Sequence, residues 1–211
     1  NWYNFNDESV SPIDESKFSA SSKSLGSIGA IRFPMYHRCS KCKVLCKLKP
    51  HSTDTKCNHE SNAQGSISCS QLPPYQKGTL EPVRFILKCP DGHVDDLNWH
   101  MYMKKKCMKQ HQDSHSKQTS NELSCYYLNE SSKGDFFKSI SIHCRVCNTN
   151  HDLTEIMRKT SQTETPAENP SDFELYTCNG SRHWDPDHSK EDCSARVKMV
   201  PRGQADVYVA E

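Results

Sequence analysis

The chain has 211 residues, of which 34% are hydrophobic and 25% are charged, and its formal net charge is +1. A chain this polar buries little apolar surface, so a hydrophobic core alone is not expected to hold it together. The balanced charge excludes a protein that attracts nucleic acid over its whole surface and leaves only local patches for that role. No apolar run approaches the roughly 20 residues of a membrane span, so no membrane contact is expected.

Twelve cysteines and eleven histidines can supply the missing stabilisation, either as disulfides or as metal ligands. The N-terminal segment NWYNFNDESVSP is polar and acidic and contains no apolar stretch of a secretory signal. We therefore expect a cytoplasmic protein with reduced thiols, in which clusters of cysteine indicate zinc. The chain begins without Met and ends in the alternating segment ADVYVAE, which indicates a piece of a longer protein.

Composition divides the chain into three parts. Residues 1–29 are rich in Ser, Asp and Asn, which predicts a flexible N-terminal arm. Residues 30–80 begin with an apolar and basic segment and continue into a cysteine pair, which predicts a first zinc-knuckle module. Residues 81–211 are predicted to contain a Cys-x3-His signature and a second zinc module, and to end before the remainder of the protein.

The predicted secondary structure is short and mixed. The segment PVRFILKC (82–89) is rich in branched and aromatic residues, and further strands are predicted at 123–128, 139–144, 195–200 and 206–210. LNWHMYMKKK (97–106) predicts a helix with Asp95 or Asp96 at its N-cap. A short helix at 153–159 precedes an acidic linker at 160–172. These elements predict an α+β fold, made of irregular zinc-stapled modules with short strands and few short helices.

Two CxxC motifs provide the main metal signal: Cys39 with Cys42, and Cys144 with Cys147. Two intervening residues allow both sulfurs of a motif to turn onto one ion. Tetrahedral zinc requires four ligands, with sulfur at about 2.3 Å, so each motif needs a second pair of ligands further along the chain.

Cysteines downstream of each motif are the candidates for this second pair. For the first motif we expect Cys57 and Cys69, while Cys46 remains a competitor. For the second motif we expect Cys178 and Cys193, so that zinc would tie residues 144–193 into one loop. The alternative is that some of these thiols are only small buried hydrophobic side chains.

The segment KCPDGHVDDLNWH (88–100) holds further candidate ligands. Cys89 and His93 have an acceptable spacing for a third zinc site, so two zinc ions are expected and a third is left open. In the alternative interpretation Cys89 ends a buried strand and His93 forms a hydrogen bond within a turn. Cys107 and Cys125 remain without assigned partners.

The same segment also allows a catalytic interpretation, in which His93, Asp95 and Asp96 form a metal-dependent hydrolase site. The chain contains no Gly-rich phosphate loop, GxSxG or HExxH motif that would support it. The two aspartates are better explained by a helix cap. We therefore predict a protein that is not an enzyme and has no small-molecule substrate, with the hydrolase as an alternative.

Local positive charge gathers around the first CxxC motif and in the predicted helix. A basic zinc knuckle with nearby aromatic residues such as Phe33 and Tyr36 can follow a phosphate backbone. The alternatives are that the lysines only make a small metal module soluble, or that exposed Trp99 and Trp184 contact a protein. The candidate nucleic-acid-binding residues are Arg38, Lys41, Lys43, Lys47, Lys49, Lys104, Lys105 and Lys106.

Several of these segments together resemble one family. RFILKCPDGHVDDLNWHMYM resembles the signature of the DrmB family, in which an aromatic-rich strand precedes Cys, two residues, Gly-His, an aliphatic residue and Asp-Asp. RFPMYHRCSKC, IHCRVC, CNGSRHW and VPRGQADVYVAE resemble further family segments and occur in the family's order. Asn98 stands where the family usually has proline, and Gln204, Ala205 and Asp206 also depart from its pattern.

The resemblance, which covers residues 30–211 discontinuously, implies a role for the whole protein. DrmB is the helicase-associated component of the bacterial anti-phage system DISARM. The resemblance implies a non-catalytic zinc-binding subunit that partners a superfamily-2 helicase, DrmA, and contacts DNA. The residues by themselves leave a stand-alone zinc-ribbon DNA-binding protein as the main alternative.

Overall fold

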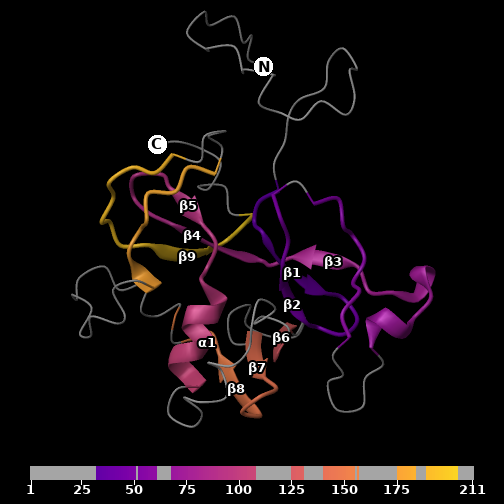
Figure 1. The fold of residues 1–211 in the computed structure, drawn as a ribbon. Helices are drawn as coiled ribbons and strands as arrows, with labels where there is room; N and C mark the ends of the chain where they lie inside the picture. Colours follow the sequence, from indigo (N-terminus) through magenta and orange to yellow (C-terminus); the bar gives the residue numbers. More distant parts are fainter. Residues whose placement is uncertain are drawn as a thin grey trace, which may run out of the picture. The chain divides into compact units, whose positions relative to one another are not determined.

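The computed structural model describes residues 32–50, 52–60, 68–107, 125–130, 140–154, 156, 175–183 and 189–203. Within these residues, nine short strands form three three-stranded sheets in which every pairing is antiparallel (Figure 1). The fold class is therefore α+β, with short strands and few short helices, as the sequence predicted. The predicted arm (1–29), linker (160–172) and last strand (206–210) lie outside the described residues.

The first sheet has the strand order β2-β1-β3 and carries the first CxxC motif. β1 (Tyr36–Cys39) pairs with β2 (Leu45–Lys47) across the turn that the motif forms, and with β3 (Leu80–Pro82) on its other side. The sequence did not predict these strands, because three or four residues interrupted by Cys and Lys give no clear alternation. The pairing of β1 with β3 places Cys39 opposite Leu80.

The second sheet has the order β5-β4-β9. β4 (Phe85–Lys88) is the strand predicted at 82–89, and its first three residues are buried, as a central strand requires. β5 (Val94–Asp95) pairs on one side of β4 and β9 (Lys198–Pro201) on the other. The second sheet therefore places the Cys-x3-His segment, which connects β4 to β5, next to the C-terminal part of the described chain.

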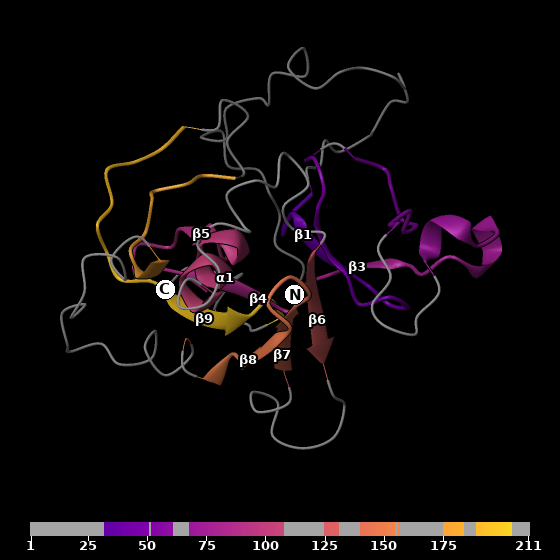
Figure 2. The same ribbon diagram turned by 60° about the horizontal axis from the view of Figure 1, so that its bottom comes forward.

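The third sheet has the order β6-β7-β8, and its strands lie side by side in both ribbon views (Figures 1 and 2). β6 (Tyr126–Glu130) and β7 (Ile140–Cys144) correspond to the two strands predicted in this region. β8 (Thr149–Asp152) was not predicted. Cys144 pairs with Thr149, so the second CxxC motif forms the turn between β7 and β8.

The helix α1 (Trp99–Cys107) begins differently from the prediction. Its N-cap is Asn98, whose side-chain oxygen Oδ1 accepts a hydrogen bond from the backbone N–H of Met101 at 3.0 Å. Asp96, which was predicted as a cap, instead accepts a hydrogen bond from the backbone N–H of Met35 at 2.8 Å. Asn98 lies one residue before the helix, which is the position from which a side chain reaches the free N–H groups of the first turn.

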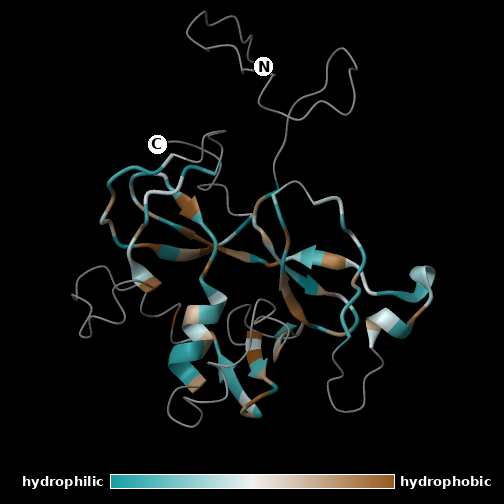
Figure 3. Cartoon of the chain, viewed as in Figure 1, coloured by the Kyte–Doolittle hydropathy of each residue, from teal (hydrophilic) through white to brown (hydrophobic). Residues whose placement is uncertain are grey.

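One apolar core connects the three sheets and α1. It contains Leu45 from β2, Phe85 from β4, Leu128 from β6 and Ile142 from β7, together with Trp99, which was expected to be exposed and is fully buried. Figure 3 shows that the central strand β4 is mainly hydrophobic, whereas β8 is hydrophilic. None of the described helices has the length and apolarity that crossing a bilayer requires.

A second buried cluster has a different composition, because four of its six buried members are cysteines. The other two are Val44 and Tyr127, which form an antiparallel bridge between the first and third sheets. Aliphatic side chains contribute little to this cluster, so hydrophobic packing alone does not explain how it is held together.

Candidate metal centres

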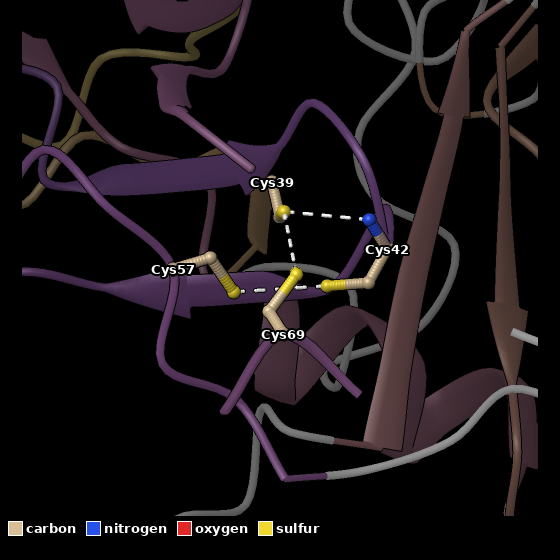
Figure 4. Close-up of side chains that lie close together, drawn as sticks. All are labelled: Cys39, Cys42, Cys57 and Cys69. Carbon is tan, nitrogen blue, oxygen red and sulfur yellow. Dashed lines mark hydrogen bonds between the residues drawn. The ribbon is translucent and has the colours of Figure 1, made fainter. Parts of the chain in front are cut away.

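The side chains of four cysteines from the first module converge on one point (Figure 4). Cys39 ends β1, Cys42 lies in the turn before β2, Cys57 lies in the following loop and Cys69 begins a 3₁₀ helix, Cys69–Gln71. All four are buried, and their sulfurs lie within 4.8 Å of one another. The sulfur of Cys39 is 3.8 Å from that of Cys69, and the sulfur of Cys42 is 3.7 Å from that of Cys57.

These distances fit a tetrahedral zinc site. Four sulfurs bound to zinc at about 2.3 Å lie about 3.8 Å apart, whereas the two sulfurs of a disulfide lie about 2.0 Å apart. The N–H groups of Lys41 and Cys42 donate hydrogen bonds to the sulfur of Cys39 at 3.4 and 3.3 Å, which stabilises a thiolate there. Hydrogen bonds with the thiols of Cys39 and Cys42 raise the pKa of Cys57 above its ordinary value.

Gly78 leaves the space that the sulfur of Cys39 occupies. A Cβ atom at this position would collide with that sulfur and would lie 2.8 Å from the Cβ of Lys41. The carbonyl oxygen of Gly78 accepts a hydrogen bond from the N–H of Cys57 at 2.8 Å, so the same residue also positions a second ligand. No sequence motif indicated this role, because Gly78 meets both cysteines only through the tertiary fold.

The second group combines Cys89 and His93 with Cys178 and Cys193, and their ligand atoms all lie within 4.8 Å of one another. The Nδ1 atom of His93 is 3.4 Å from the sulfur of Cys89, so Nδ1 is the ring nitrogen that faces the cysteines. The N–H of Gly180 donates a hydrogen bond to the sulfur of Cys178 at 3.3 Å. Three thiols and one imidazole are an ordinary ligand set for structural zinc.

A carboxylate outside this ligand set orients the imidazole of His93. The Nε2 atom of His93 lies 2.8 Å from Oε2 of Glu191, which also forms an ion pair with Arg182. A carboxylate at this position favours the tautomer that carries hydrogen on Nε2, which leaves the lone pair of Nδ1 for a metal. Sequence spacing did not identify Glu191, because it lies 98 residues from His93.

The third group contains Cys107 from the end of α1 and the two cysteines of the second CxxC motif, Cys144 and Cys147. Their sulfurs lie within 4.8 Å of one another. The sulfur of Cys147 is 3.1 Å from that of Cys107 and 3.0 Å from the hydroxyl oxygen of Thr149. Cys125 is buried immediately before β6, where a hydrogen bond to the thiol of Cys144 raises the pKa of Cys125 above its ordinary range.

The structure therefore arranges the candidate ligands into three groups that could hold metal ions. The first group unites the four cysteines that the sequence associated with the first CxxC motif. The second motif was expected to share a site with Cys178 and Cys193, but in the structure these two cysteines belong to another group. Cys178 and Cys193 lie with Cys89 and His93, whereas Cys144 and Cys147 lie with Cys107.

Strand pairing explains this difference. β9 follows Cys193 closely and pairs with β4, which ends just before Cys89, so the two segments meet at the same end of these paired strands. The second CxxC motif lies at the turn between β7 and β8, and there it meets Cys107. Cys46, the competitor in the first module, lies outside the three groups, and its thiol donates to the backbone oxygen of His37 at 3.5 Å.

The residues considered for a hydrolase do not converge on one point. His93 faces the second cysteine group, and Oδ1 of Asp95 lies 2.9 Å from Nε2 of His183. Asp96 accepts the hydrogen bond from Met35. None of the described groups of candidate metal ligands contains either aspartate. The two aspartates instead connect the HVDD segment to parts of the chain that precede and follow it.

The two aspartates are predicted to affect stability with opposite signs. Burial, and to a lesser degree the charge of Asp95, raises the pKa of Asp96 to about 6. The folded protein thus holds this proton more tightly than the unfolded chain, so the Asp96 carboxylate destabilises the fold above pH 6 and this effect fades below it. Asn at this position retains an acceptor for the Met35 N–H without the charge. We expect Asp96→Asn to raise the free energy of unfolding by about 1–3 kcal/mol at pH 7.5.

Asp95→Asn is the matched control. Burial raises the pKa of Asp95, but the hydrogen bond and charge of His183 outweigh this, and the net pKa is lowered. A lowered pKa stabilises the fold at neutral pH, and this contribution is lost as the pH falls through the folded value. Asp95→Asn should therefore reduce the free energy of unfolding at pH 7.5, the opposite sign to Asp96→Asn. Urea denaturation from pH 5.5 to 8, with bound metal measured throughout, tests both; equal destabilisation by the two substitutions would contradict these roles.

The predicted nucleic-acid-binding residues divide into buried and exposed ones. Arg38 is buried, and its guanidinium forms ion pairs with Glu81 at 2.8 Å and with Glu130 at 3.2 Å. Glu130 also pairs with Arg84 at 3.0 Å, so Arg38 belongs to a charge network within the fold. Lys43, Lys105 and Lys106 are partly buried, and the exposed members of the set are Lys41, Lys47, Lys49 and Lys104.

Comparisons with known proteins agree with the resemblance found in the sequence. The chain is 27% identical over 181 residues to the DISARM protein DrmB of Bacillus paralicheniformis, an alignment that covers 85% of this chain. It spans only 26% of the length of that relative. This similarity supports the DrmB-like resemblance. Residues 6–209 also match the family described as a domain of unknown function, DUF8724, and because this match extends over nearly the whole chain, the protein belongs to the DUF8724 family.

Proposed function

We propose that this chain is a non-catalytic, zinc-binding part of a cytoplasmic anti-phage defence subunit, which partners a superfamily-2 helicase of the DrmA kind and contacts DNA. The observation that carries this proposal is the similarity to the DISARM protein DrmB over 85% of the chain. The geometry of the cysteine groups supports the zinc-binding part of it, and the exposed lysines around the first CxxC motif support the DNA contact.

Zinc in these groups would hold together segments that are far apart in the sequence. The first group joins Cys39 to Cys69, and the second joins Cys89 to Cys193. Zinc with four protein ligands has no open coordination position for a water molecule or a substrate, so its role is structural. The ions would therefore determine where the surrounding side chains are placed, and those side chains would make the functional contacts.

The proposed DNA contact lies around the first CxxC motif. Lys41, Lys47 and Lys49 are exposed there, and Nζ of Lys41 donates a hydrogen bond to the backbone oxygen of Gln76 at 3.0 Å. The adjoining Tyr75 is 80% exposed, which is unusual for a large aromatic residue. Lysines attract phosphates, and an exposed tyrosine ring can stack on an unpaired base, so this combination favours single-stranded DNA.

Two matched pairs of exposed lysines test the DNA contact. Lys47→Ala with Lys49→Ala should weaken binding to single-stranded DNA and reduce the slope of log affinity against log salt by about 1–2. Lys190→Ala with Lys198→Ala removes the same charge from exposed positions of the C-terminal segment and should leave both quantities unchanged. Fluorescence anisotropy across a salt series measures them. Equal losses in the two double variants would contradict the proposed surface.

The partner distinguishes this proposal from a stand-alone zinc-ribbon DNA-binding protein. A helicase subunit should co-purify with a helicase from its own cells and should bind DNA only modestly in isolation. A stand-alone protein should bind tightly and with steep salt dependence without any partner. Affinity purification of the tagged full-length protein, followed by mass spectrometry, makes the comparison; tight binding of the isolated protein with no helicase recovered would favour the alternative.

A further inference from the structure

The third cysteine group contains three ligands, whereas a structural zinc site requires four. We propose that Cys125 is the missing ligand, and that Cys107, Cys125, Cys144 and Cys147 together form a complete structural zinc site. This inference rests on the proposed zinc-binding role and extends it to a site that sequence spacing did not predict.

Backbone contacts hold Cys125 next to the second CxxC motif. In the register of β6 and β7, the residue that follows it, Tyr126, pairs with Cys144. The carbonyl oxygen of Cys125 accepts a hydrogen bond from the N–H of Arg145 at 2.9 Å, inside the motif itself. The side chain is also buried, with 5% of the residue exposed. The position of Cys125 is therefore determined by the same strand pairing that forms the turn of the motif.

Cys144 is the common neighbour of the other three thiols. Its side chain forms hydrogen bonds with those of Cys107, Cys125 and Cys147. The sulfur of Cys125 does not lie within 4.8 Å of all three other sulfurs, so the four thiols do not yet form a compact tetrahedron. Rotation about the Cα–Cβ bond moves a cysteine sulfur without changing the backbone, and bound zinc supplies the attraction that would select the inward rotamer.

The turn of the second CxxC motif repeats the turn of the first. Lys43 and Asn148 each follow the second cysteine of a motif, and their φ angles are 63° and 52°. In the described part of the chain no other residue except glycine has a positive φ. This left-handed conformation is unfavourable for side chains larger than hydrogen. Because the first such turn belongs to a complete set of four cysteines, the second turn indicates the same use.

His151 is the competing candidate for the fourth ligand. Its Nε2 lies 3.1 Å from the hydroxyl oxygen of Thr149, and that oxygen lies 3.0 Å from the sulfur of Cys147. The hydroxyl of Thr149 therefore stands between the imidazole and the sulfur. His151 is therefore better placed to orient Cys147 through Thr149 than to bind the ion itself.

This assignment accounts for nearly all of the cysteines. Eleven of the twelve, with His93, would supply twelve ligands to three tetrahedral ions. Cys46 remains outside the sites, and burial raises the pKa of this thiol to about 11. The third site would also tie the last turn of α1 to the third sheet. Its ligand Cys107 directly follows Lys104–Lys106, so the same ion would help to place these lysines.

Zinc stoichiometry of matched variants tests the assignment. The full chain, loaded with zinc and analysed by native mass spectrometry, should hold three ions. Cys125→Ser should lose one of them at a chelator concentration that leaves three in the wild type, with affinity at that site reduced at least about tenfold. Cys46→Ser serves as the control and should retain three ions, because Cys46 lies outside the three groups. Binding of Co²⁺ to the wild-type chain gives a readout that does not depend on any variant folding, because thiolate-to-cobalt absorption reports the number of bound sulfurs. Eleven cobalt–sulfur bonds are expected.

Ion counts or cobalt–sulfur counts that differ from these expectations show which part of the assignment is wrong. Retention of three ions by Cys125→Ser, or ten cobalt–sulfur bonds in the wild type, would overturn the assignment of Cys125. Ten cobalt–sulfur bonds in the wild type together with loss of one ion in His151→Gln would make the histidine the ligand, whereas eleven bonds with the same loss would leave it the orienting role. A wild-type chain with two ions would overturn the third site and leave the proposed zinc-binding role in place. A chain that holds no zinc would overturn both.

Discussion

Removal of metal by a strong zinc chelator is expected to abolish the cooperative thermal transition of this chain. A structural zinc contributes on the order of 10–16 kcal/mol of apparent folding free energy, whereas whole domains are stable by only about 5–15 kcal/mol. The apolar contribution is small here, because only 34% of the residues are hydrophobic and one of the two buried clusters consists mainly of cysteines. The remaining packing is therefore not expected to offset the loss of the ions.

Circular dichroism in the far ultraviolet, recorded during a thermal scan, measures this effect. Chelation should remove the cooperative transition, and excess Zn²⁺ should restore it, whereas Mg²⁺ should not because it prefers oxygen ligands. Cys46→Ser should behave like the wild type throughout, since Cys46 lies outside the three groups. An unchanged transition in a sample shown by mass spectrometry to be free of metal would mean that the apolar core is sufficient.

Gly180→Ala should be the most damaging of the glycine substitutions, with an expected loss of more than about 3 kcal/mol. The φ angle of Gly180 is 67°, which an L residue adopts only with strain. A Cβ atom would also collide with the carbonyl oxygen of Glu191, a backbone atom that cannot rotate away. Glu191 orients His93, and its N–H donates to the carbonyl oxygen of Gly180 at 3.0 Å. The substitution should therefore also reduce metal affinity at the second group.

Two other glycines separate the conformational effect from the steric one. Gly92 lies between two ligands of the same group and has a φ of 83°, but an added Cβ would meet no atom within 4 Å. Gly92→Ala should therefore cost only the conformational part, about 1–2 kcal/mol. Gly203 has neither constraint, and Gly203→Ala should be nearly neutral. Urea denaturation with zinc present gives the three values. Equal losses for Gly92→Ala and Gly180→Ala would show that the contact with Glu191 is unimportant.

The charge network around Arg38 refines the proposed contact with DNA. Counting positive residues in the sequence placed Arg38 beside the exposed lysines, but the structure directs its guanidinium to Glu81 and Glu130. Removing one partner of a buried ion pair leaves the other uncompensated, so substitutions of Arg38 should act mainly on stability. The exposed lysines are the better positions at which to measure a contribution to DNA binding.

Local patterns in the sequence were sufficient where a few adjacent residues decide the structure. The strands β4, β6, β7 and β9 were predicted, because each overlaps a run of branched, aromatic or other apolar residues. The helix α1 was predicted, but its cap was assigned to Asp95 or Asp96 instead of Asn98. Asp, Asn and Ser are all good caps, so composition does not choose among neighbouring candidates. β1, β2, β3, β5 and β8 were missed because strands of two to four residues carry too little pattern.

The sequence by itself determined that this chain is rich in metal-ligand chemistry and poor in apolar core, and it identified the four cysteines of the first group. Those ligands lie in one hairpin and the loop that follows it, so their proximity follows from local chain geometry. Only the tertiary structure decided the other two groups, the orientation of His93 by Glu191 and the burial of Arg38 and Trp99. The two groups depend on the pairing of β4 with β9 and on the meeting of α1 with the turn between β7 and β8, whereas Arg38 pairs with Glu81 of β3 and Glu130 of β6. The contacts bring together residues separated by long loops, and the order of cysteines along a chain does not specify which of them will meet.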